Sequence, residues 1–196
     1  MKHLSLILVL LLFSCKSDLK KEVQTETNND HLVIAKNYYA VLNHTDAMDI
    51  ATLLGDSIVI RESEDNYEER KSKKDYINWW QWESVFEPTY KVQQLAKVDG
   101  TVKATVWKFD KRLSFLHNEP VIWTEIIYFD DNNKISKVDR INYEVFDGAK
   151  FVKNRDPFVQ WIAKNHPELD GFIYDQTKAG GINYIKAMEL YKSKGK

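Results

Sequence analysis

The chain of 196 residues has one cysteine, four prolines and seven glycines. A single cysteine excludes a disulfide within the chain and any zinc site built from several cysteines. An excess of charge of one sign is also missing, since 28 Lys and Arg stand against 29 Asp and Glu, for a net charge of -1. This balance argues against a protein that binds nucleic acid by neutralising phosphates, so no nucleic-acid partner is expected.

Long apolar runs are missing as well, apart from one at the N-terminus, so no internal transmembrane span is expected. The chain begins with a basic segment that contains Lys2, and residues 4–13 are almost wholly apolar. The small residue Ser14 comes next. A basic start, about ten apolar residues and a small residue before the cleavage point are typical of a secretory signal. Residues 1–14 are therefore predicted to be a signal peptide.

The segment Leu12-Phe13-Ser14-Cys15 resembles the lipobox of bacterial lipoproteins. This resemblance implies cleavage after Ser14, lipidation of Cys15 through a thioether, and acylation of the new N-terminus. It places the protein in the bacterial cell envelope, lipid-anchored through Cys15, and at the outer membrane because no Asp follows the cysteine. The alternative is an ordinary signal peptide with a chance cysteine. Residues 15–30 are polar and are predicted to be a flexible tether.

A folded domain is predicted over residues 31–147. Apolar residues at three- and four-residue spacing predict a helix over 31–42, then a short second helix capped by Thr45 or Asp46 and ended by Gly55. A strand over 57–61, a charged loop over 63–71 and a helix from Asp75 to Phe86 follow. The pair Ser72 and Asp75 is a weak capping signal for that helix.

After Pro88 the apolar period changes to two, which indicates strands. Strands are predicted over 90–98, 101–109, 121–129 and 134–146, with 113–117 as an extension of the second. Asp99-Gly100 is a strong hairpin signal. The expected fold class is α+β, a curved antiparallel sheet with the helices packed on one face.

This order of elements resembles the nuclear transport factor 2-like superfamily, which includes ketosteroid isomerase and the SnoaL-like polyketide cyclases. The resemblance covers residues 31–147 and implies a cone-shaped domain. It rests on the paired N-terminal helices with Asp46 before the second, the strand after Gly55-Asp56, and the closing strands over 124–143 with their step Phe129, Asn133, Lys134, Ile135.

Residues 148–196 are predicted to be a C-terminal helical extension. One helix begins at Asp156-Pro157 and ends before His166-Pro167. A loop over 168–176 leads to a last helix capped by Thr177, in which Ile182, Ile185 and Met188 share a face and Gly180-Gly181 weaken the first turn. The apolar faces of the extension are expected to close the mouth or back of the cone, or to meet a dimer partner.

Aromatic residues are the candidates for binding a ligand, because ligand pockets are mainly apolar and aromatic. The helix over 75–86 contains three tryptophans, which cannot all face the same core. The alternative for these residues is ordinary core packing. The candidate ligand-binding residues are Tyr38, Trp79, Trp82, Trp107 and Trp123.

Two carboxylates are the candidates for catalysis. Glu125 lies inside the apolar stripe of its strand, and on the last strand Asp139 is expected on the same face as Tyr143, opposite to Arg140. A carboxyl group in an apolar cavity acts as an acid or base, and in the isomerase branch such a group abstracts a proton from carbon. Glu125 or Asp139 would be the base, with Tyr143 or Tyr38 as the hydrogen-bond donor.

The alternative to catalysis is pairing of Glu125 with Arg140 or Lys137 across neighbouring strands. His117 is the one histidine considered as a base, although a histidine in a turn is the simpler interpretation. The spacing of the histidines predicts no metal site, and no phosphate-binding glycine loop or cofactor motif is present.

Three functions remain open. The preferred one is binding of a small apolar or aromatic ligand, or of a protein partner, without catalysis. The second is an isomerase, cyclase or dehydratase that uses one cavity carboxylate. The third is a structural module that forms a homodimer through its sheet.

Overall fold

The computed structural model describes residues 30–44 and 47–195. The predicted signal peptide, Cys15 and the predicted caps Thr45 and Asp46 lie outside these ranges. No helix in the described ranges is long and apolar enough to cross a membrane. The elements follow the order α1 (His31–Leu42), α2 (Ala47–Leu53), β1 (Leu54–Glu62), β2 (Tyr67–Ser72), α3 (Lys73–Ser84), β3 (Thr89–Val98), β4 (Thr101–Phe109), α4 (Lys111–Leu116), β5 (Val121–Phe129), β6 (Ile135–Val145), α5 (Gly148–Asn165), the 3₁₀ turn η1 (Pro167–Leu169) and α6 (Lys178–Ser193).

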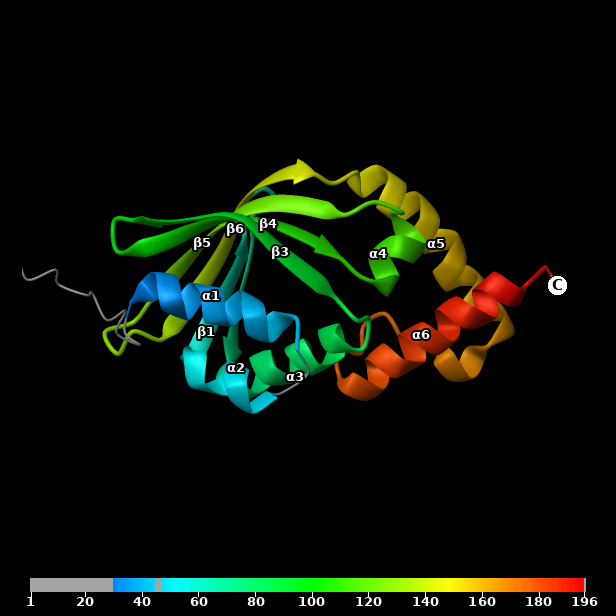
Figure 1. The fold of residues 1–196 in the computed structure, drawn as a ribbon. Coiled ribbons are helices and arrows are strands. Elements are labelled where there is room, and N and C mark those ends of the chain that lie inside the picture. The colour runs from blue at the N-terminus through cyan, green and yellow to red at the C-terminus, as the bar shows by residue number, and fades with distance from the viewer. Residues whose placement is uncertain (1–29, 45–46, 196) are drawn as a thin grey trace, which may run out of the picture.

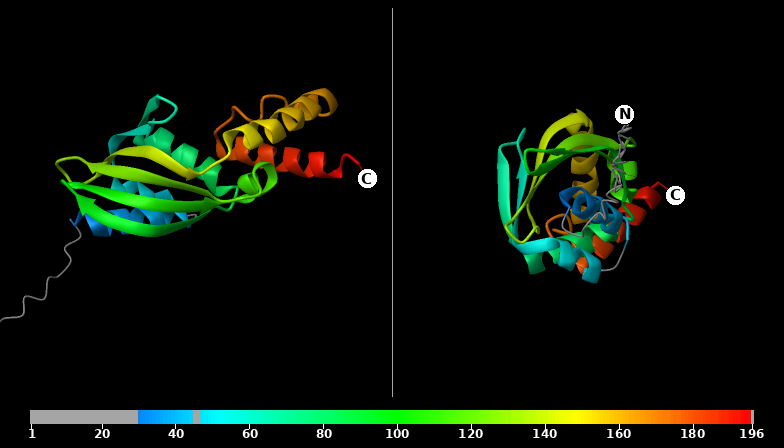
Figure 2. Two further views of the ribbon diagram at one scale, coloured as in Figure 1. Left: turned by 90° about the horizontal axis from the view of Figure 1, so that it is seen from above. Right: turned by 60° about the vertical axis from the view of Figure 1, so that its left-hand side comes forward.

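The described strands form one sheet of six, in the order β2-β1-β6-β5-β4-β3. The pairing of β1 with β6 is parallel, and the other pairs are antiparallel. The sheet curves, and α1 lies across its hollow side with α2 and α3 next to it (Figures 1 and 2). This arrangement confirms the predicted α+β class. The curved sheet and the N-terminal helices together form the predicted cone, and a C-terminal helical extension follows.

Local signals explain the elements that the sequence predicted correctly. Asp30 caps α1 by accepting a hydrogen bond from the backbone of Leu32, and Ser72 caps α3 by accepting one from Asp75. Asp99 and Gly100 both have positive φ, at 47° and 79°, as the hairpin turn between β3 and β4 requires. The strands β4 and β5 have the predicted bounds.

Two predictions for the domain over residues 31–147 were wrong. The charged segment expected to be a loop contains the strand β2, which pairs only with β1 at the edge of the sheet. Charged residues suit an exposed edge strand because they oppose pairing with another chain. Residues 113–117 do not extend β4 but belong largely to α4, because the carboxylate of Asp110 accepts the backbone N–H of Leu113 at 2.6 Å and begins a helix.

The extension differs from the prediction at its start and at one face. Helix α5 begins at Gly148, capped by Asp147, so Pro157 lies inside it instead of starting it. Helix α6 begins after Thr177 as predicted, and Thr177 accepts the N–H of Gly180. Ile182 was expected on the buried face of α6 but is 55% exposed.

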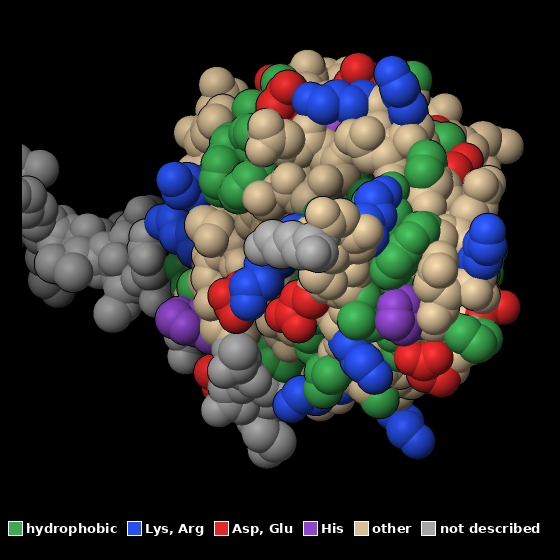
Figure 3. All heavy atoms as spheres, turned by 90° about the vertical axis from the view of Figure 1, so that its right-hand side faces the viewer, with side chains coloured by type: hydrophobic (Ala, Val, Ile, Leu, Met, Phe, Trp, Pro, Cys, Tyr) green, Lys and Arg blue, Asp and Glu red, His purple; other side chains and the backbone are tan. Residues whose placement is uncertain are grey.

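Two apolar cores hold the described chain together. The first lies between the sheet and helices α1 and α3. The second lies between α3, α4 and the extension, and includes Trp82, Phe86, Leu116 and Phe158. Trp79 packs against both. The extension therefore packs on α3 and α4 at one end of the cone. On the surface at that end, charged side chains separate several small groups of hydrophobic side chains (Figure 3).

The glycines that begin α6 are explained by close packing. A Cβ at Gly180 would lie 2.0 Å from the carbonyl oxygen of Asp175, and one at Gly181 would lie 3.1 Å from the carbonyl oxygen of Trp82. Gly181 thus allows the close approach of α6 to α3, and Gly180 makes room for the loop that precedes α6. The loss of helix propensity at the two glycines is offset by burial of the second core.

We predict that Gly180→Ala destabilises the protein, by roughly 2 kcal/mol, because the clash with Asp175 outweighs the gain in helix propensity of about 1 kcal/mol. Gly148→Ala, in the first turn of α5, is the matched control, since its Cβ would lie 3.5 Å from the ring of Phe146, an ordinary van der Waals contact. That control is expected to be neutral or stabilising. Urea unfolding followed by circular dichroism measures both, and equal midpoints for the two variants would contradict the packing argument.

Candidate functional site

Two pockets share the side chain of Arg140 on the hollow side of the sheet. The first, of about 220 Å³, has an aromatic wall of Trp123, Tyr143, Phe146 and Phe151. We call it the aromatic–basic pocket, because its charged lining residues are Lys108, Arg112 and Arg140. The second, of about 190 Å³, is lined by tyrosines and paired charges, and we call it the hydroxyl-lined pocket.

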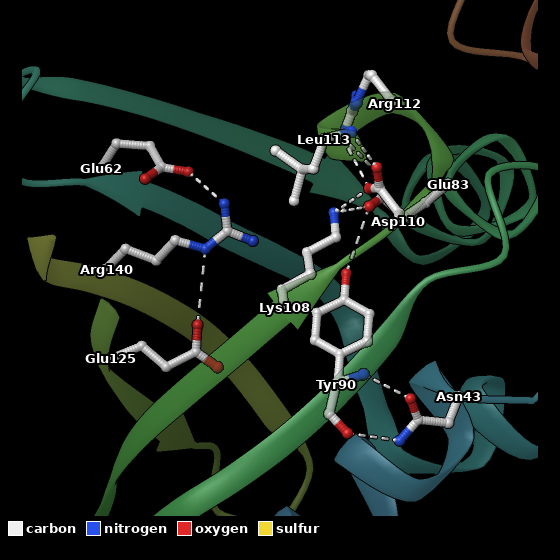
Figure 4. Close-up of polar contacts among 10 residues, drawn as sticks. All are labelled: Asn43, Glu62, Glu83, Tyr90, Lys108, Asp110, Arg112, Leu113, Glu125 and Arg140. Atoms are coloured by element: carbon white, nitrogen blue, oxygen red, sulfur yellow. Dashed lines mark hydrogen bonds and ion pairs between the residues drawn. The ribbon is translucent and has the colours of Figure 1, made fainter. Parts of the chain in front are cut away.

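Arg140 is held by carboxylates from the strands on both sides of β6 (Figure 4). Its Nη1 donates to Glu62 of β1 at 2.6 Å, and its Nε lies 3.6 Å from Glu125 of β5. The guanidinium also lies over the ring of Trp123, 4.8 Å from the ring centre. Burial alone would lower the pKa of Arg140, but Glu62, Tyr143 and Glu125 raise it above its ordinary value, so the side chain stays charged.

Glu125 is buried, and both of its carboxylate oxygens accept hydrogen bonds. Its carboxylate accepts a hydrogen bond from the hydroxyl of Tyr39 at 2.5 Å and another from the indole N–H of Trp123 at 2.7 Å. Burial, with the negative charge of Glu125 next in importance, raises the pKa of Tyr39, so this hydroxyl keeps its proton and donates it. Glu125 thus points inward, as predicted, and pairs with Arg140 as the alternative interpretation held. A role as a base would first require these contacts to break.

Asp139 does not share a face with Tyr143, so that prediction was wrong. Three register shifts occur along the pairing of β5 with β6, and each moves the alternation of side chains. Consequently Arg140 and Tyr143 both line the aromatic–basic pocket. Asp139 instead accepts a hydrogen bond from Ser63 at 2.8 Å and lies 3.5 Å from Lys137.

The proposed donors are also engaged. The hydroxyl of Tyr143 donates to Glu62 at 2.5 Å. Burial, opposed by Arg140, raises the pKa of Tyr143, so it too remains protonated. The hydroxyl of Tyr38 lies 2.6 Å from that of Tyr76, at the hydroxyl-lined pocket.

A second polar cluster, which we call the Lys108 cluster, shares Lys108 and Arg112 with the lining of the aromatic–basic pocket. Figure 4 shows its contacts. The ammonium of Lys108 contacts the carboxylate of Glu83 from α3 and lies 3.2 Å from that of Asp110. Arg112 approaches the same two carboxylates at 3.5 and 3.6 Å. The hydroxyl of Tyr90 lies 3.5 Å from Glu83.

Burial and charge act in opposite directions in this cluster. Loss of water lowers the pKa of Lys108, to about 7, although Asp110 acts the other way. Burial would raise the pKa of Asp110, but Lys108, Arg112 and the N–H of Leu113 outweigh it and hold this pKa below its ordinary value. Asp110 therefore serves both as the cap of α4 and as the counter-ion of two cations.

The Lys108 cluster was missed by sequence reasoning, although two signals were present. Lys108 continues the alternating buried stripe Val102, Ala104, Val106 on β4, which places its side chain on the hollow side. Glu83 lies on the apolar side of α3. A charged residue in each of two apolar stripes indicates a buried pair, since an unpaired charge would be too costly there.

The predicted aromatic residues lie in different places. Trp123 lines the aromatic–basic pocket, and Tyr38 and Trp79 line the hydroxyl-lined pocket. Trp82 is buried in the second core, with Arg112 over its ring at 4.8 Å. Trp107 carries Lys91 over its ring at 4.7 Å and lines neither of the two pockets.

His117 is completely buried and joins two loops. Its Nε2 accepts the N–H of Asp147 at 3.0 Å, so the proton of the neutral ring is on Nδ1, which faces the carbonyl oxygen of Glu119 at 3.2 Å. These contacts give it a structural role at the start of α5. Within residues 30–44 and 47–195, no group of three or more His, Cys, Asp or Glu side chains is arranged to hold a metal ion.

No family model matches the chain, and no curated protein matches it. Among solved structures, a protein from Kribbella flavida that is described provisionally as a ketosteroid isomerase has 16% identity and a TM-score of 0.49, covering 60% of this chain and 80% of that one. A nuclear transport factor 2-like protein of unknown function from Cytophaga hutchinsonii has 8% identity and a TM-score of 0.44, covering 57% and 88%.

A protein from Catenulispora acidiphila with a ketosteroid isomerase-like fold has 7% identity and a TM-score of 0.47, covering 62% of this chain and 90% of that one. These three neighbours are described as nuclear transport factor 2-like or ketosteroid isomerase-like proteins. Likeness at this level says nothing of what this chain binds or converts.

We predict that Asp110→Asn lowers the free energy of unfolding by roughly 3 kcal/mol at pH 7, because it leaves buried cations short of a partner while keeping the cap of α4. The folded-state pKa of Asp110 lies below its unfolded value of about 3.9, so its stabilisation is complete well above that value. It is lost as the pH falls through the folded-state value. The variant should therefore lose less stability than the wild type on acidification below about pH 5.

The matched control is Asp147→Asn, because Asp147 caps α5 from an exposed position. Its effect should stay within about 0.5 kcal/mol. Denaturant unfolding over a series of pH values measures both variants. Parallel curves for Asp110→Asn and the wild type would contradict a lowered folded-state pKa of Asp110, and coincident curves would show that its charge contributes nothing to stability.

Proposed function

We propose that this domain binds a small ligand with an apolar or aromatic body and an acidic group in the aromatic–basic pocket, without catalysis. The observation that carries the proposal is the lining of this pocket. All its charged lining residues are cations, whereas the carboxylates that contact them, among them Glu83, Asp110 and Glu125, are not part of the lining.

The two arginines have donors to spare. Arg140 uses Nη1 for Glu62, and Arg112 uses Nη2 for the Lys108 cluster. No hydrogen bond joins the other Nη of either side chain to the part of the chain that the structure describes. Charge-assisted hydrogen bonds from a guanidinium suit a carboxylate well. Trp123, Phe146 and Phe151 line the same pocket and offer apolar surface to the body of the ligand.

Size limits the ligand further. A volume of about 220 Å³ lies below the range of roughly 300–1,000 Å³ that is usual for drug-sized ligands. A single ring, or a short chain with one acidic group, therefore fits better than a polycyclic molecule. The alternative of an isomerase or cyclase has less support, because Glu125 and Asp139 are both engaged by neighbouring groups.

We also propose that the protein is lipid-anchored in the bacterial cell envelope through Cys15, at the outer membrane. Support comes from the basic start, the apolar stretch and the lipobox-like segment that ends at the single cysteine. Acyl chains on this residue would hold the domain at a membrane, since each buried methylene contributes about 0.8 kcal/mol. The folded domain begins at residue 31, so a tether of about 15 residues would separate it from the lipid surface.

We predict that phenylacetate binds to the full chain measurably more tightly than its neutral isostere phenylacetamide. Arg112→Gln should weaken the binding of phenylacetate about tenfold, because one charge-assisted hydrogen bond is lost. Arg61→Gln is the control, because Arg61 lies on an exposed strand position and lines neither pocket. Isothermal titration calorimetry measures each affinity. Equal binding of acid and amide, or equal loss in both variants, would refute the acidic-ligand proposal.

We predict that an alkyne-bearing fatty acid labels the wild-type chain expressed in a bacterium that processes lipoproteins, and that Cys15→Ser abolishes the label. The matched control is Cys15→Ser combined with Ser17→Cys, which keeps one cysteine but moves it out of the lipobox-like segment. Gel fluorescence after click chemistry reads the label, and membrane fractionation reads the location. Labelling of the displaced cysteine, or membrane attachment of the Cys15→Ser chain, would contradict anchoring at this residue.

A further inference from the structure

The hydroxyl-lined pocket differs in chemistry from the aromatic–basic pocket and is the more enclosed of the two. Tyr38 from α1 lines it, together with Tyr76 and Trp79 from α3. Strands β1 and β2 contribute Glu62 and Glu69, and the loop before α6 adds Gln176. The N-terminal helices, the sheet and the extension therefore meet around one small space.

The charges of this pocket cancel one another. Glu62 is paired with Arg140 at 2.6 Å, and Glu69 is paired with Lys71 at 2.7 Å. The carboxylates also accept hydrogen bonds from the hydroxyls of Tyr143 and Tyr67, respectively. Because carboxylates and cations both line this pocket, unlike the aromatic–basic pocket, an ion that entered would lose its hydration and meet a charge of its own sign. The pocket therefore favours a neutral ligand.

A pair of buried hydroxyls gives the pocket an unsatisfied donor. Tyr38 and Tyr76 are 3% and 1% exposed, and their hydroxyl oxygens lie 2.6 Å apart. Burial raises the pKa of both, so each keeps its proton. Only one of the two protons can lie between the oxygens, and no other hydrogen bond joins either hydroxyl to the described residues. A ligand oxygen would satisfy it.

Aromatic surface lies beside these polar groups. Trp79 is half-buried, and Tyr67 is 48% exposed at the strand β2. Gln176 is exposed and adds an amide that both donates and accepts. A ring with apolar C–H faces and several hydroxyl groups matches this combination. We propose that the hydroxyl-lined pocket is a second ligand site and that it takes a neutral, polyhydroxylated ring such as one sugar unit.

The test uses the full chain with methyl β-D-glucopyranoside and N-acetyl-D-glucosamine as probes, and saturation-transfer NMR with titration as the measurement. Saturable binding of at least one probe is expected. Trp79→Leu should weaken it about tenfold through the lost aromatic contact. The matched control Trp107→Leu removes a half-buried tryptophan that lines neither pocket and should leave the affinity unchanged.

Gln176→Ala keeps the test valid if Trp79→Leu fails to fold, because Gln176 is exposed in a loop. This variant should weaken the binding of the sugar about threefold, because one hydrogen bond is lost. Phenylacetate should not displace the sugar, which separates this site from the aromatic–basic pocket. The proposal is overturned if neither sugar binds saturably, if the two tryptophan variants lose affinity equally, or if choline binds in a Trp79-dependent manner instead.

Discussion

Burial of the Arg140 guanidinium is the requirement on which the interior of this domain depends. A charge on the hollow side of the sheet needs partners, and these come from both neighbouring strands. Glu62 of β1 and Glu125 of β5 are both in register with Arg140. A slip of one residue on either side would turn a carboxylate to the other face and leave a charge unpaired, at a cost of about 3–5 kcal/mol. The ion pairs therefore help to fix the register of β1 and β5 against β6, including the parallel pairing of β1 with β6.

Much of the fold could be predicted because local signals and burial agreed. Period-two patterns located β4 and β5, and Asp99-Gly100 located the hairpin between β3 and β4. The errors fall where tertiary contacts decide. The strand β2 has no apolar stripe and exists because β1 offers it a pairing edge. Helix α5 begins before its expected start because Asp147 caps it and His117 accepts the same residue's N–H.

The candidate site was predicted only in part, for a reason of geometry. Simple alternation placed Glu125 correctly, since β5 has a regular buried stripe over most of its length. It misplaced Asp139 and Tyr143, because bulges in the pairing with β6 shift which side chains face inward. The bulges between β5 and β6 could not be predicted, because no glycine stands at the positions where the register shifts. Lys108 could have been found from the apolar stripe that it continues, but its partners Glu83 and Asp110 come from other elements.

The two apolar cores bear on how the molecule unfolds. Trp79 and Phe151 pack against both, and the extension supplies most of the second core while Trp82, Phe86 and Leu116 join it from the preceding domain. A fragment ending at residue 147 would expose Trp82, Phe86 and Leu116 to water, at a cost of roughly 1.5–3 kcal/mol for each large side chain. Sheet and extension therefore form one cooperative unit. Amide protons of the sheet and of the extension should therefore exchange equally slowly. If the extension were a dispensable tail, its amide protons would exchange faster than those of the sheet.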